Sequence, residues 1–384
     1  MRLKWYMSNG AMKQSNNEKK VAIVHDFLMS FGGAERVLQS FCRLYPDAPV
    51  YTLLSDSEMA RKYFPGRDIR TSFLQKFPAF LRSRYRFLLP FFPVAVETFD
   101  LRDFNLVISS SGAWSKGVVT RLRTRHIAYL HSPMRYLWDA NETYLARTRA
   151  HACAKFFGRF LLSYLRLWDR EAALRPDVLV SNSGYTKARV AKYYRRESEV
   201  VYPSVAFAGT DEPVSRGKFF LVVARLAESK GVDVAVEAFN KLGLPLQVVG
   251  SGHELRHLRS IAAKNISFLG FVPDRVLAGL YASARAVIVP SEEDFGLAAA
   301  EALAEGTPVI ALGRGGVREV VTEGVTGEYF LAETPEVLAD AVRRFLSDEA
   351  SFSREACRQS AARFSEERFM TEWRRIIAET MGKE

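Results

Sequence analysis

The stretch RAVIVPSEEDFGLAAAEALAEGTPVIALG, residues 285–313, decides the fold class. It opens with a short β-branched run at 285–291 and closes with another at 307–313. Between them lies an alanine-rich segment, which is typical of a helix. A strand, a helix and a second apolar strand in this order predict a parallel βαβ unit whose sheet is covered on both faces.

Similar apolar runs recur along the chain in two series. The first predicts strands at 21–27, 48–54, 104–111, 125–131, 177–183 and 199–205. The second predicts strands at 219–225, 245–251, 265–271, 285–291 and 307–313. Helical stretches separate the runs, so we predict an α/β protein with two Rossmann-like, doubly wound domains facing a central cleft.

The predicted domain organisation follows from these series. We expect a disordered leader at 1–19, an N-terminal domain at 20–203 and a C-terminal domain at 204–364. The amphipathic segment 365–384 is predicted to pack back on the first domain. Ligands of such folds gather at the carboxyl ends of the strands, and the motifs described below all follow a predicted strand.

Charge divides the chain into two unlike halves. Residues 1–200 hold 33 Lys and Arg against 17 Asp and Glu, and residues 201–384 hold 21 against 26. A basic half is compatible with a nucleic acid, an anionic membrane or a phosphate-bearing substrate, and charge alone does not choose among them. No RNA-binding signature accompanies the basic residues, so we expect no nucleic-acid partner.

Cysteine spacing and the first residues bear on the compartment. The three cysteines, Cys42, Cys153 and Cys357, form no C-x-x-C pair, so neither a disulfide framework nor a zinc site is predicted. The polar first twenty residues lack the apolar core of a signal peptide. No apolar run is long enough to span a membrane. We therefore expect a cytoplasmic protein.

A glycine pair follows the first predicted strand, in FGGAERVLQSF at 31–41. Gly32 and Gly33 allow the backbone to approach a ligand closely, and the helix that follows offers free N–H groups to an anion. An ordinary glycine turn before a helix explains the same pattern equally well.

Two cations lie in the loop VVARLAESKG at 222–231. Arg225 and Lys230 follow a strand and precede a helix, where they could bind a diphosphate and stabilise it as it leaves. Each one taken singly is more often a solvated surface charge.

The stretch 285–313 contains a third group of candidate functional residues. If its helix starts near Phe295, then Glu293 precedes the helix, the amides of Phe295, Gly296 and Leu297 are free donors, and Glu301 lies in the second turn. Two carboxylates so placed could each hold the hydroxyl groups of a sugar or a ribose. Helix-dipole compensation and a solvated face are the alternatives.

Taken in order, FGGAERV, VVARLAESKG, VVGSG and EEDFGLAAAEALAEGTPVI resemble the motifs of the retaining glycosyltransferases of family GT4. The resemblance covers about residues 20–380 and implies the GT-B fold. The segments HDFLMSFGGAERVL and YLHSPMRYLWD most resemble the corresponding segments of bacterial mannosyltransferases of O-antigen, lipopolysaccharide and exopolysaccharide assembly.

The resemblance also implies roles for individual residues. It assigns the diphosphate to Arg225 and Lys230, the donor sugar to Glu293, and the ribose to Glu301. It places the Phe295, Gly296 and Leu297 amides toward the sugar and phosphate, and the helix start near Gly33 toward the phosphate. It places Ser251, Val272 and Asp274 near the base, and His131 against a hydroxyl of the donor sugar.

The same resemblance implies the substrates. We expect GDP-mannose as donor and a glycan acceptor linked to a polyprenyl diphosphate. No D-x-D motif is present, and we expect neither a metal ion nor another cofactor. Retaining hydrolases need a closely spaced carboxylate pair, and no carboxylate nucleophile is apparent on the reactive face here. The leaving phosphate would therefore act as the base.

The segment 70–102 mixes aromatic and basic residues and has no acid before Glu97. It could lie on the inner face of the cytoplasmic membrane, with apolar side chains inserted and cations near lipid phosphates. A helical insertion whose aromatics pack on the first domain explains it equally well. Two rival functions also stay open: a GT-B sugar-nucleotide 2-epimerase and a basic nucleic-acid-binding protein.

Overall fold

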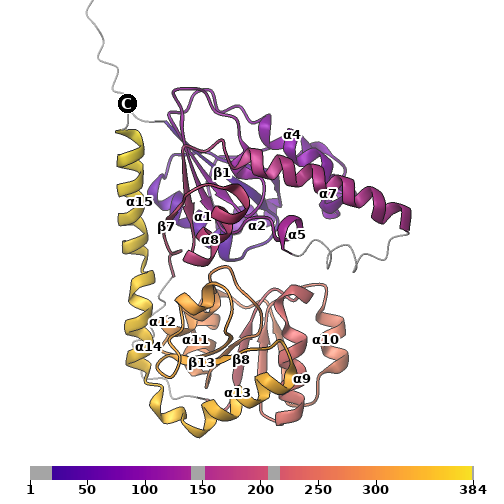
Figure 1. Ribbon diagram of the computed structural model, residues 1–384, viewed down its shortest axis with the longest axis vertical. Coiled ribbons are helices and arrows are strands. Elements are labelled where there is room, and N and C mark those ends of the chain that lie inside the picture. Colours follow the sequence, from indigo (N-terminus) through magenta and orange to yellow (C-terminus); the bar gives the residue numbers. More distant parts are fainter. Residues whose placement is uncertain (1–19, 140–151, 206–216, 383–384) are drawn as a thin grey trace, which may run out of the picture.

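The computed structural model describes residues 20–139, 152–205 and 217–382. The predicted leader and most of the segment joining the two strand series lie outside these residues. Within them the chain forms two separate parallel sheets, which Figure 1 shows one above the other.

The first sheet has the strand order β3-β2-β1-β4-β5-β6-β7, and its paired strands all run parallel. Its strands are β1 Val21–Leu28, β2 Val50–Ser55, β3 Ile69–Thr71, β4 Leu106–Ser111, β5 Arg125–Leu130, β6 Val178–Ser181 and β7 Glu199–Val200. The accompanying α-helices are α1 Gly33–Leu44, α2 Ser57–Tyr63, α3 Ala79–Ser83, α4 Phe92–Glu97, α5 Arg135–Trp138, α7 Ala152–Ala172 and α8 Gly184–Tyr194. Three 3-10 turns are η1 Phe73–Lys76, η2 Tyr85–Phe91 and η3 Ser115–Gly117.

The second sheet has the order β10-β9-β8-β11-β12-β13, again with parallel pairs. Its strands are β8 Phe220–Val223, β9 Leu246–Val249, β10 Ile266–Gly270, β11 Val287–Val289, β12 Val309–Leu312 and β13 Gly327–Phe330. Its α-helices are α9 Val232–Leu242, α10 Leu255–Ile261, α11 Asp274–Ser283, α12 Leu297–Ala304, α13 Pro335–Ser347 and α14 Arg354–Ala361. The last helix, α15 Glu366–Met381, follows α14 and packs on the first half. The 3-10 turns are η4 Glu228–Lys230, η5 Gly316–Glu319, η6 Glu349–Ser351 and η7 Ala362–Phe364.

All eleven strands expected from the sequence are present, so the predicted α/β class with two Rossmann-like sheets is confirmed. The structure adds two short strands that the sequence did not indicate. β3 has only three residues, and β13, Gly-Glu-Tyr-Phe, lacks an apolar run. Both lie at the edge of a sheet, where fewer buried side chains are needed.

Apolar clusters cover both faces of each sheet. Phe220 and Phe239 belong to one cluster of the second sheet, and Val287 and Leu303 belong to the cluster on the other face. This two-sided burial explains why the strands read as continuous apolar runs instead of alternating patterns.

Strand order reverses at one point in each sheet. In the first sheet β1 lies between β2 and β4, and in the second β8 lies between β9 and β11. The crossover connections leave such a point in opposite directions, so the loops at its carboxyl end diverge and leave space for a ligand. The loops after β1, β4, β8 and β11 are therefore the places to look for a site.

The last helix belongs to the core of the first half. Trp373 of α15 is fully buried and packs edge-on against Phe41 at 4.7 Å and near Tyr129 at 5.8 Å. Figure 1 shows α15, in yellow, running from the second half along the side of the first. This helix ties the two halves together outside the strand connections.

The aromatic and basic segment 70–102 divides its side chains between core and solvent. Leu88 and Phe92 are buried in the first half, whereas Phe80 and Phe87 are 64% and 73% exposed. Within the described residues, no helix is both long and apolar enough to cross a membrane.

Candidate active site

Lys230 and Glu293 meet at the point of strand reversal in the second sheet. Lys230 Nζ donates to both carboxylate oxygens of Glu293 at 2.7 Å, and Ser291 Oγ donates to Oε1 at 2.8 Å. Lys230 comes from the loop after β8 and Glu293 from the loop after β11. The sequence placed both residues at a site, and the structure brings them into direct contact.

Glycines hold these loops together. Gly231 has φ +57°, and a Cβ there would lie 2.8 Å from the carbonyl oxygen of Pro290. On the other side, a Cβ on Gly315 or Gly316 would lie 2.3 Å from the Glu293 carbonyl oxygen or 2.1 Å from that of Asp294. Only glycine allows these backbones to approach so closely. The position of the Glu293 carboxylate therefore depends on both neighbouring loops.

Opposing effects set the charge of Glu293. Burial favours the neutral acid, but the positive charge of Lys230 and the hydrogen bonds from Lys230 and Ser291 outweigh it, so the pKa of Glu293 is lowered. Glu293 is thus held as a carboxylate, a form that accepts hydrogen bonds from hydroxyl groups.

The helix after Glu293 begins two residues later than the sequence indicated. It starts at Leu297, with Gly296 at its N-cap in the left-handed region at φ +97°. The Phe295 side chain is buried between Tyr202 and Phe364, with ring centroids 5.7 and 5.2 Å away. Phe295 thus contributes its backbone, and not its ring, to any site at this helix start.

The predicted glycine pair Gly32–Gly33 and the start of α12 face each other across the halves. A Cβ on Gly33 would lie 3.0 Å from Cδ2 of Leu297, the first residue of α12. Gly32 is the N-cap of α1, with no side chain capping the helix. The amino ends of α1 and α12 therefore lie close together and present their amides from opposite halves.

Arg36 connects the first half to two further predicted residues. Its guanidinium donates to Asp274 at 2.7 and 3.1 Å and lies 3.4 Å from Glu301 Oε1. Tyr281 also donates to Glu301, at 2.8 Å. Burial raises the pKa of Glu301, and Arg36 and the Tyr281 hydroxyl only partly oppose it. Glu301 and Asp274 are thus joined through one residue of the other half.

Arg225 and Ser251 lie beside one another in the second half. The Leu226 amide donates to the Ser251 carbonyl at 2.9 Å, and a Cβ on Gly252 would lie 2.0 Å from the Leu226 carbonyl oxygen. The side chains of Arg225 and Ser251 are exposed, and Val272 packs against the apolar cluster beneath. Arg225 has no ion-pair partner within the described residues, which leaves its charge available to a ligand.

Asp294, which lies between Glu293 and Phe295, is a main polar contact between the halves. Its carboxylate accepts from Arg189 at 2.6 Å, from Ser132 at 3.1 Å and twice from Arg135 at 3.2 Å. Arg135 also donates to the carbonyl oxygen of Glu292 at 3.1 Å. These contacts fix the Glu293 backbone from the opposite half.

A second contact between the halves lies at the start of α8. Glu319 of η5 accepts from the amides of Gly184 and Tyr185, both at 2.8 Å, and from the Tyr202 hydroxyl at 3.1 Å. A carboxylate at a helix amino end is favourably placed in the helix dipole. It adds to the Asp294 contacts in holding the halves together.

His131 follows β5 directly and lies on the first half. Its Nε2 is 2.8 Å from Ser110 Oγ, and its carbonyl oxygen accepts from Asn182 at 2.9 Å. Burial and the nearby His25 lower the pKa of His131 to about 4, although Asp26 and Glu35 act in the other direction. His131 is therefore a neutral imidazole at physiological pH.

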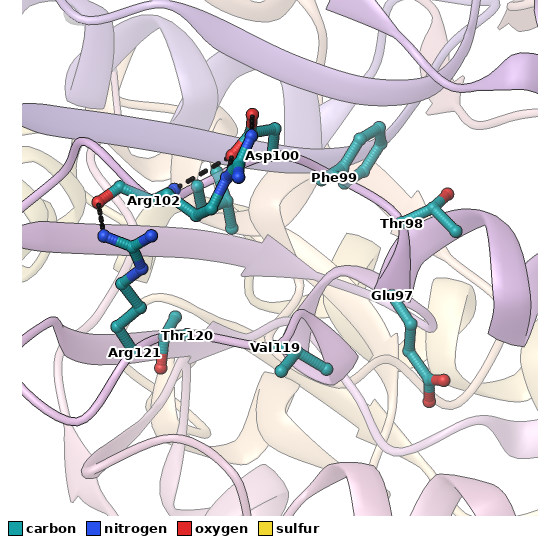
Figure 2. Close-up of a pocket in the computed structure, with 9 residues that line it drawn as sticks. Glu97, Thr98, Phe99, Asp100, Arg102, Val119, Thr120 and Arg121 are labelled. Carbon is teal, nitrogen blue, oxygen red and sulfur yellow. Dashed lines mark hydrogen bonds and ion pairs between the residues drawn. The ribbon is translucent and has the colours of Figure 1, made fainter.

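A separate hollow of about 480 Å³ lies away from these residues. Figure 2 shows its lining, which comes from the segments before β4 and β5, at 97–102 and 119–121. Arg102 there pairs with Asp100, and Arg121 donates to the Arg102 carbonyl. This hollow lies at the amino ends of the strands, and we place the site at their carboxyl ends because the paired charges and free helix amides lie there.

No group of three or more His, Cys, Asp or Glu side chains in the described part of the chain could hold a metal ion. The residues assembled here are those suited to an anion and to hydroxyl groups: lysine, arginine, helix amides and carboxylates.

Sequence reasoning missed Arg36, Asp294, Arg135 and Arg189. The first three lie inside motifs that the sequence singled out, but their partners belong to the other half of the chain. Nothing in local spacing indicates such a pairing. A weak signal was the charge contrast of the halves, since arginines of the basic half meet carboxylates of the acidic half.

Two family models match the chain. The model described as Glycosyltransferase Family 4 matches residues 31–207, and the model described as Glycosyl transferases group 1 matches residues 210–364. A D-inositol 3-phosphate glycosyltransferase of Corynebacterium urealyticum is 35% identical over 52% of this chain and 56% of its own length. The matched region spans about a third to just over half the length of the first curated relatives.

Solved structures share the fold. Sucrose-phosphate synthase from Thermosynechococcus elongatus matches with a TM-score of 0.71 at 18% identity, over 95% of this chain and 100% of that one. Anabaena HepE in complex with UDP matches with a TM-score of 0.66 at 16% identity, over 93% and 100%. These likenesses confirm the GT-B arrangement of two Rossmann-like sheets.

Proposed function

The chain is of the family 4 glycosyltransferase type with a GT-B fold, and from this premise we propose that it is an enzyme that transfers a sugar from a nucleotide sugar to an acceptor hydroxyl with retention of configuration. The observation that carries the proposal is the Lys230–Glu293 pair at the strand reversal of the second sheet. This pair places a cation that suits phosphate binding beside a carboxylate that suits hydrogen bonds from sugar hydroxyls.

The donor's diphosphate would bind to Lys230, Arg225 and the amides at the amino ends of α1 and α12. Fixed cations and aligned helix amides stabilise the negative charge that grows on the leaving phosphate. Glu293 would accept hydrogen bonds from the sugar, and Glu301 from the ribose. Ser251, Val272 and Asp274 would lie near the base.

In the proposed reaction the bond between the anomeric carbon and the leaving phosphate oxygen breaks as the acceptor oxygen bonds to the same face of that carbon. The acceptor proton passes to the leaving phosphate, which acts as the base. Lys230 and Arg225 lower the energy of the departing dianion without a metal ion. His131 would contact a hydroxyl of the sugar and help to orient it.

GDP-mannose is the donor we propose, on the resemblance of the glycine-rich and His131 motifs to bacterial mannosyltransferases. The Anabaena neighbour is a complex with UDP, so uridine sugars are the alternative to test beside it. A polyprenyl-diphosphate-linked glycan is the proposed acceptor. The excess of basic residues over residues 1–200 supports an anionic acceptor on that half.

We propose that the protein works in the cytoplasm on the inner face of the cytoplasmic membrane. The exposed Phe80 and Phe87 lie among basic residues, which suits contact with an anionic lipid surface. The matching family model and the Corynebacterium urealyticum relative are named as glycosyltransferases, so the two alternative functions, a 2-epimerase and a nucleic-acid-binding protein, are not favoured.

A binding and turnover panel tests the proposal. GDP-mannose, UDP-glucose and ADP-glucose are each added in excess, and the melting temperature and the release of nucleoside diphosphate are measured with and without EDTA. A donor held by both halves should raise the melting temperature, since a ligand that binds only the folded state stabilises it. GDP-mannose should raise the melting temperature and release nucleoside diphosphate in the presence of EDTA. Lys230→Ala should abolish both results.

The other results are equally informative. A rise in melting temperature with UDP-glucose alone would replace GDP-mannose as the proposed donor and leave the proposed glycosyltransferase activity in place. Loss of the shift with EDTA would overturn the metal-free mechanism. Nucleotide-sugar conversion without any acceptor would favour the epimerase.

A further inference from the structure

Four side chains of the first half form one chain of hydrogen bonds that ends at His131. Glu35 Oε1 lies 3.4 Å from His25 Nε2, His25 Nδ1 lies 3.1 Å from Ser110 Oγ, and Ser110 Oγ lies 2.8 Å from His131 Nε2. His25 and Ser110 are 2% and 0% exposed. Water therefore has little access to the middle of the chain.

The fold places these groups together at the strand reversal of the first sheet. His25 of β1 is the register partner of Ser110 of β4, and His131 follows the next strand, β5. Glu35 comes from the first turn of α1, where the helix dipole favours a carboxylate. Neighbouring Ser109 faces the other side of the sheet, where its Oγ lies 2.8 Å from His126 Nε2.

Counting protons along the chain leaves one arrangement when both histidines are neutral. A carboxylate only accepts, so Nε2 of His25 carries the proton and Nδ1 is bare. Ser110 must then donate its single proton to Nδ1 of His25. The Ser110 oxygen is left to accept, so Nε2 of His131 carries a proton and Nδ1 of His131 is bare.

We propose that Ser110 and His25 are positioning residues that hold His131 in the tautomer with a protonated Nε2 and a bare Nδ1. His131 then offers an acceptor to a hydroxyl group of the donor sugar, a role that rests on the proposed function. Glu35 fixes the direction of the chain from its far end. The sugar hydroxyl opposite His131 must therefore be a hydrogen-bond donor to the protein.

The surrounding charges are compatible with this arrangement. Among the described residues, Asp26 is a second carboxylate, besides Glu35, whose charge acts on His131. Its carboxylate is already engaged, because it accepts from four backbone amides at 2.6–2.9 Å, those of Gly112, Ala113, Trp114 and Ser115. Asp26 shapes the loop after β4 and takes no proton position in the chain.

The test is the tautomer of His131 in the free protein, read by nitrogen-15 NMR of labelled histidine at pH 8. This pH lies well above the lowered pKa of His131, about 4, so the imidazole of His131 is neutral. The His131→Gln variant identifies the signals. We expect a protonated Nε2 and a bare Nδ1 for His131, and a proton on Nδ1 would overturn the proposal.

Two serine variants supply the comparison. Ser110→Ala should leave His131 exchanging between both tautomers, whereas Ser109→Ala, the matched change on the other sheet face, should leave its spectrum unchanged. An unchanged His131 spectrum in Ser110→Ala would also overturn the proposal. Ser110→Thr keeps the hydroxyl and suits a strand, so it should restore the wild-type tautomer.

Kinetics separate this role from a purely structural one. Ser110→Ala should lower kcat roughly ten- to hundredfold, the range seen when a metal-binding histidine loses the hydrogen-bond partner that orients it. The donor KM should change little, and Ser110→Thr should recover the rate. Equal kcat in Ser110→Ala and Ser109→Ala would contradict the positioning role. The NMR test uses the free protein and does not depend on turnover. Failure of the proposed function would appear in the donor panel, and failure of the positioning role would appear in the NMR spectra.

Discussion

Lys230 donates hydrogen bonds at 2.7 Å to both carboxylate oxygens of Glu293. The cation assigned to the diphosphate and the carboxylate assigned to the sugar are therefore bonded to each other before any donor arrives. The Lys230 ammonium keeps the buried Glu293 side chain in its charged, carboxylate form. A donor phosphate would join this pair as a third charged group and share Lys230 with Glu293.

Replacing Lys230 by alanine should lower kcat/KM about a hundredfold or more, because a fixed charge that stabilises the leaving group is lost. It should also raise the pKa of Glu293, since burial then acts with less opposition. Steady-state kinetics and circular dichroism measure activity and folding. Lys241→Ala, which breaks the exposed Lys241–Glu336 pair in the same half, is the control. Equal activity in the two variants would remove Lys230 from the site.

Asp294→Ala should loosen the contact between the halves. It removes the acceptor shared by Arg135 and Arg189, and Arg189 is only 6% exposed. Leaving a buried guanidinium without this partner should cost about 2–3 kcal/mol of unfolding free energy. Urea unfolding measures the loss, and small-angle scattering should give a larger radius of gyration. Asp340→Ala, which breaks an exposed pair with Arg344, should do neither. A compact, fully stable Asp294→Ala protein would speak against the contact.

Gly316→Ala should reduce activity through the backbone of the site. The new Cβ would lie 2.1 Å from the Asp294 carbonyl oxygen, so the segment carrying Glu293 must move. Gly279→Ala in α11 meets nothing within 4 Å and should stabilise the fold by about 0.5–1 kcal/mol. Melting temperatures and donor KM distinguish the two. A Gly316→Ala enzyme with wild-type KM and stability would refute the close approach.

Membrane contact is tested by flotation with vesicles of phosphatidylglycerol at low salt. The wild-type protein should float, and Phe80→Ser with Phe87→Ser should not, because two exposed aromatic side chains of the basic segment are lost. Leu331→Ser, which changes an equally exposed apolar residue in the other half, should still float. Recovery of the wild-type protein only in the unbound fraction would end this proposal.

The fold class and all strands except β3 and β13 were predictable from the sequence, because the central strands bury both faces and therefore read as apolar runs. Local patterns also located Lys230, Glu293 and the glycine turns, since these follow strands. The helix start was misplaced by two residues because Phe295 looks like a first helical residue, whereas its ring is buried between Tyr202 and Phe364.

Pairings across the halves were not predictable. Arg36 and Glu301 are 265 positions apart, and nothing in the spacing of either one indicates the other. The same holds for His25 and Ser110, which meet because β1 and β4 are neighbours at the strand reversal. Such contacts depend on strand order and on how the halves are joined, which periodicity does not encode.

Two buried histidines predict how stability depends on pH. Burial, with help from Arg196 and Arg175, lowers the pKa of His126 to about 3, and burial with His25 lowers that of His131 to about 4. Both values lie below the unfolded value of about 6.5, so the unfolded chain binds more protons between these limits. The stabilisation is complete above pH 6.5 and is lost as the pH falls toward 4 and 3.

Acidification from pH 7 to pH 5 should therefore cost about 2 kcal/mol of unfolding free energy for each of these histidines. Most carboxylates titrate below this window, so they contribute little to the change. Urea unfolding at both pH values measures it. His126→Gln should have a smaller loss than the wild-type protein, whereas His253→Gln, an exposed histidine, should match the wild type. Identical losses in the two variants would show that His126 takes up no proton on unfolding.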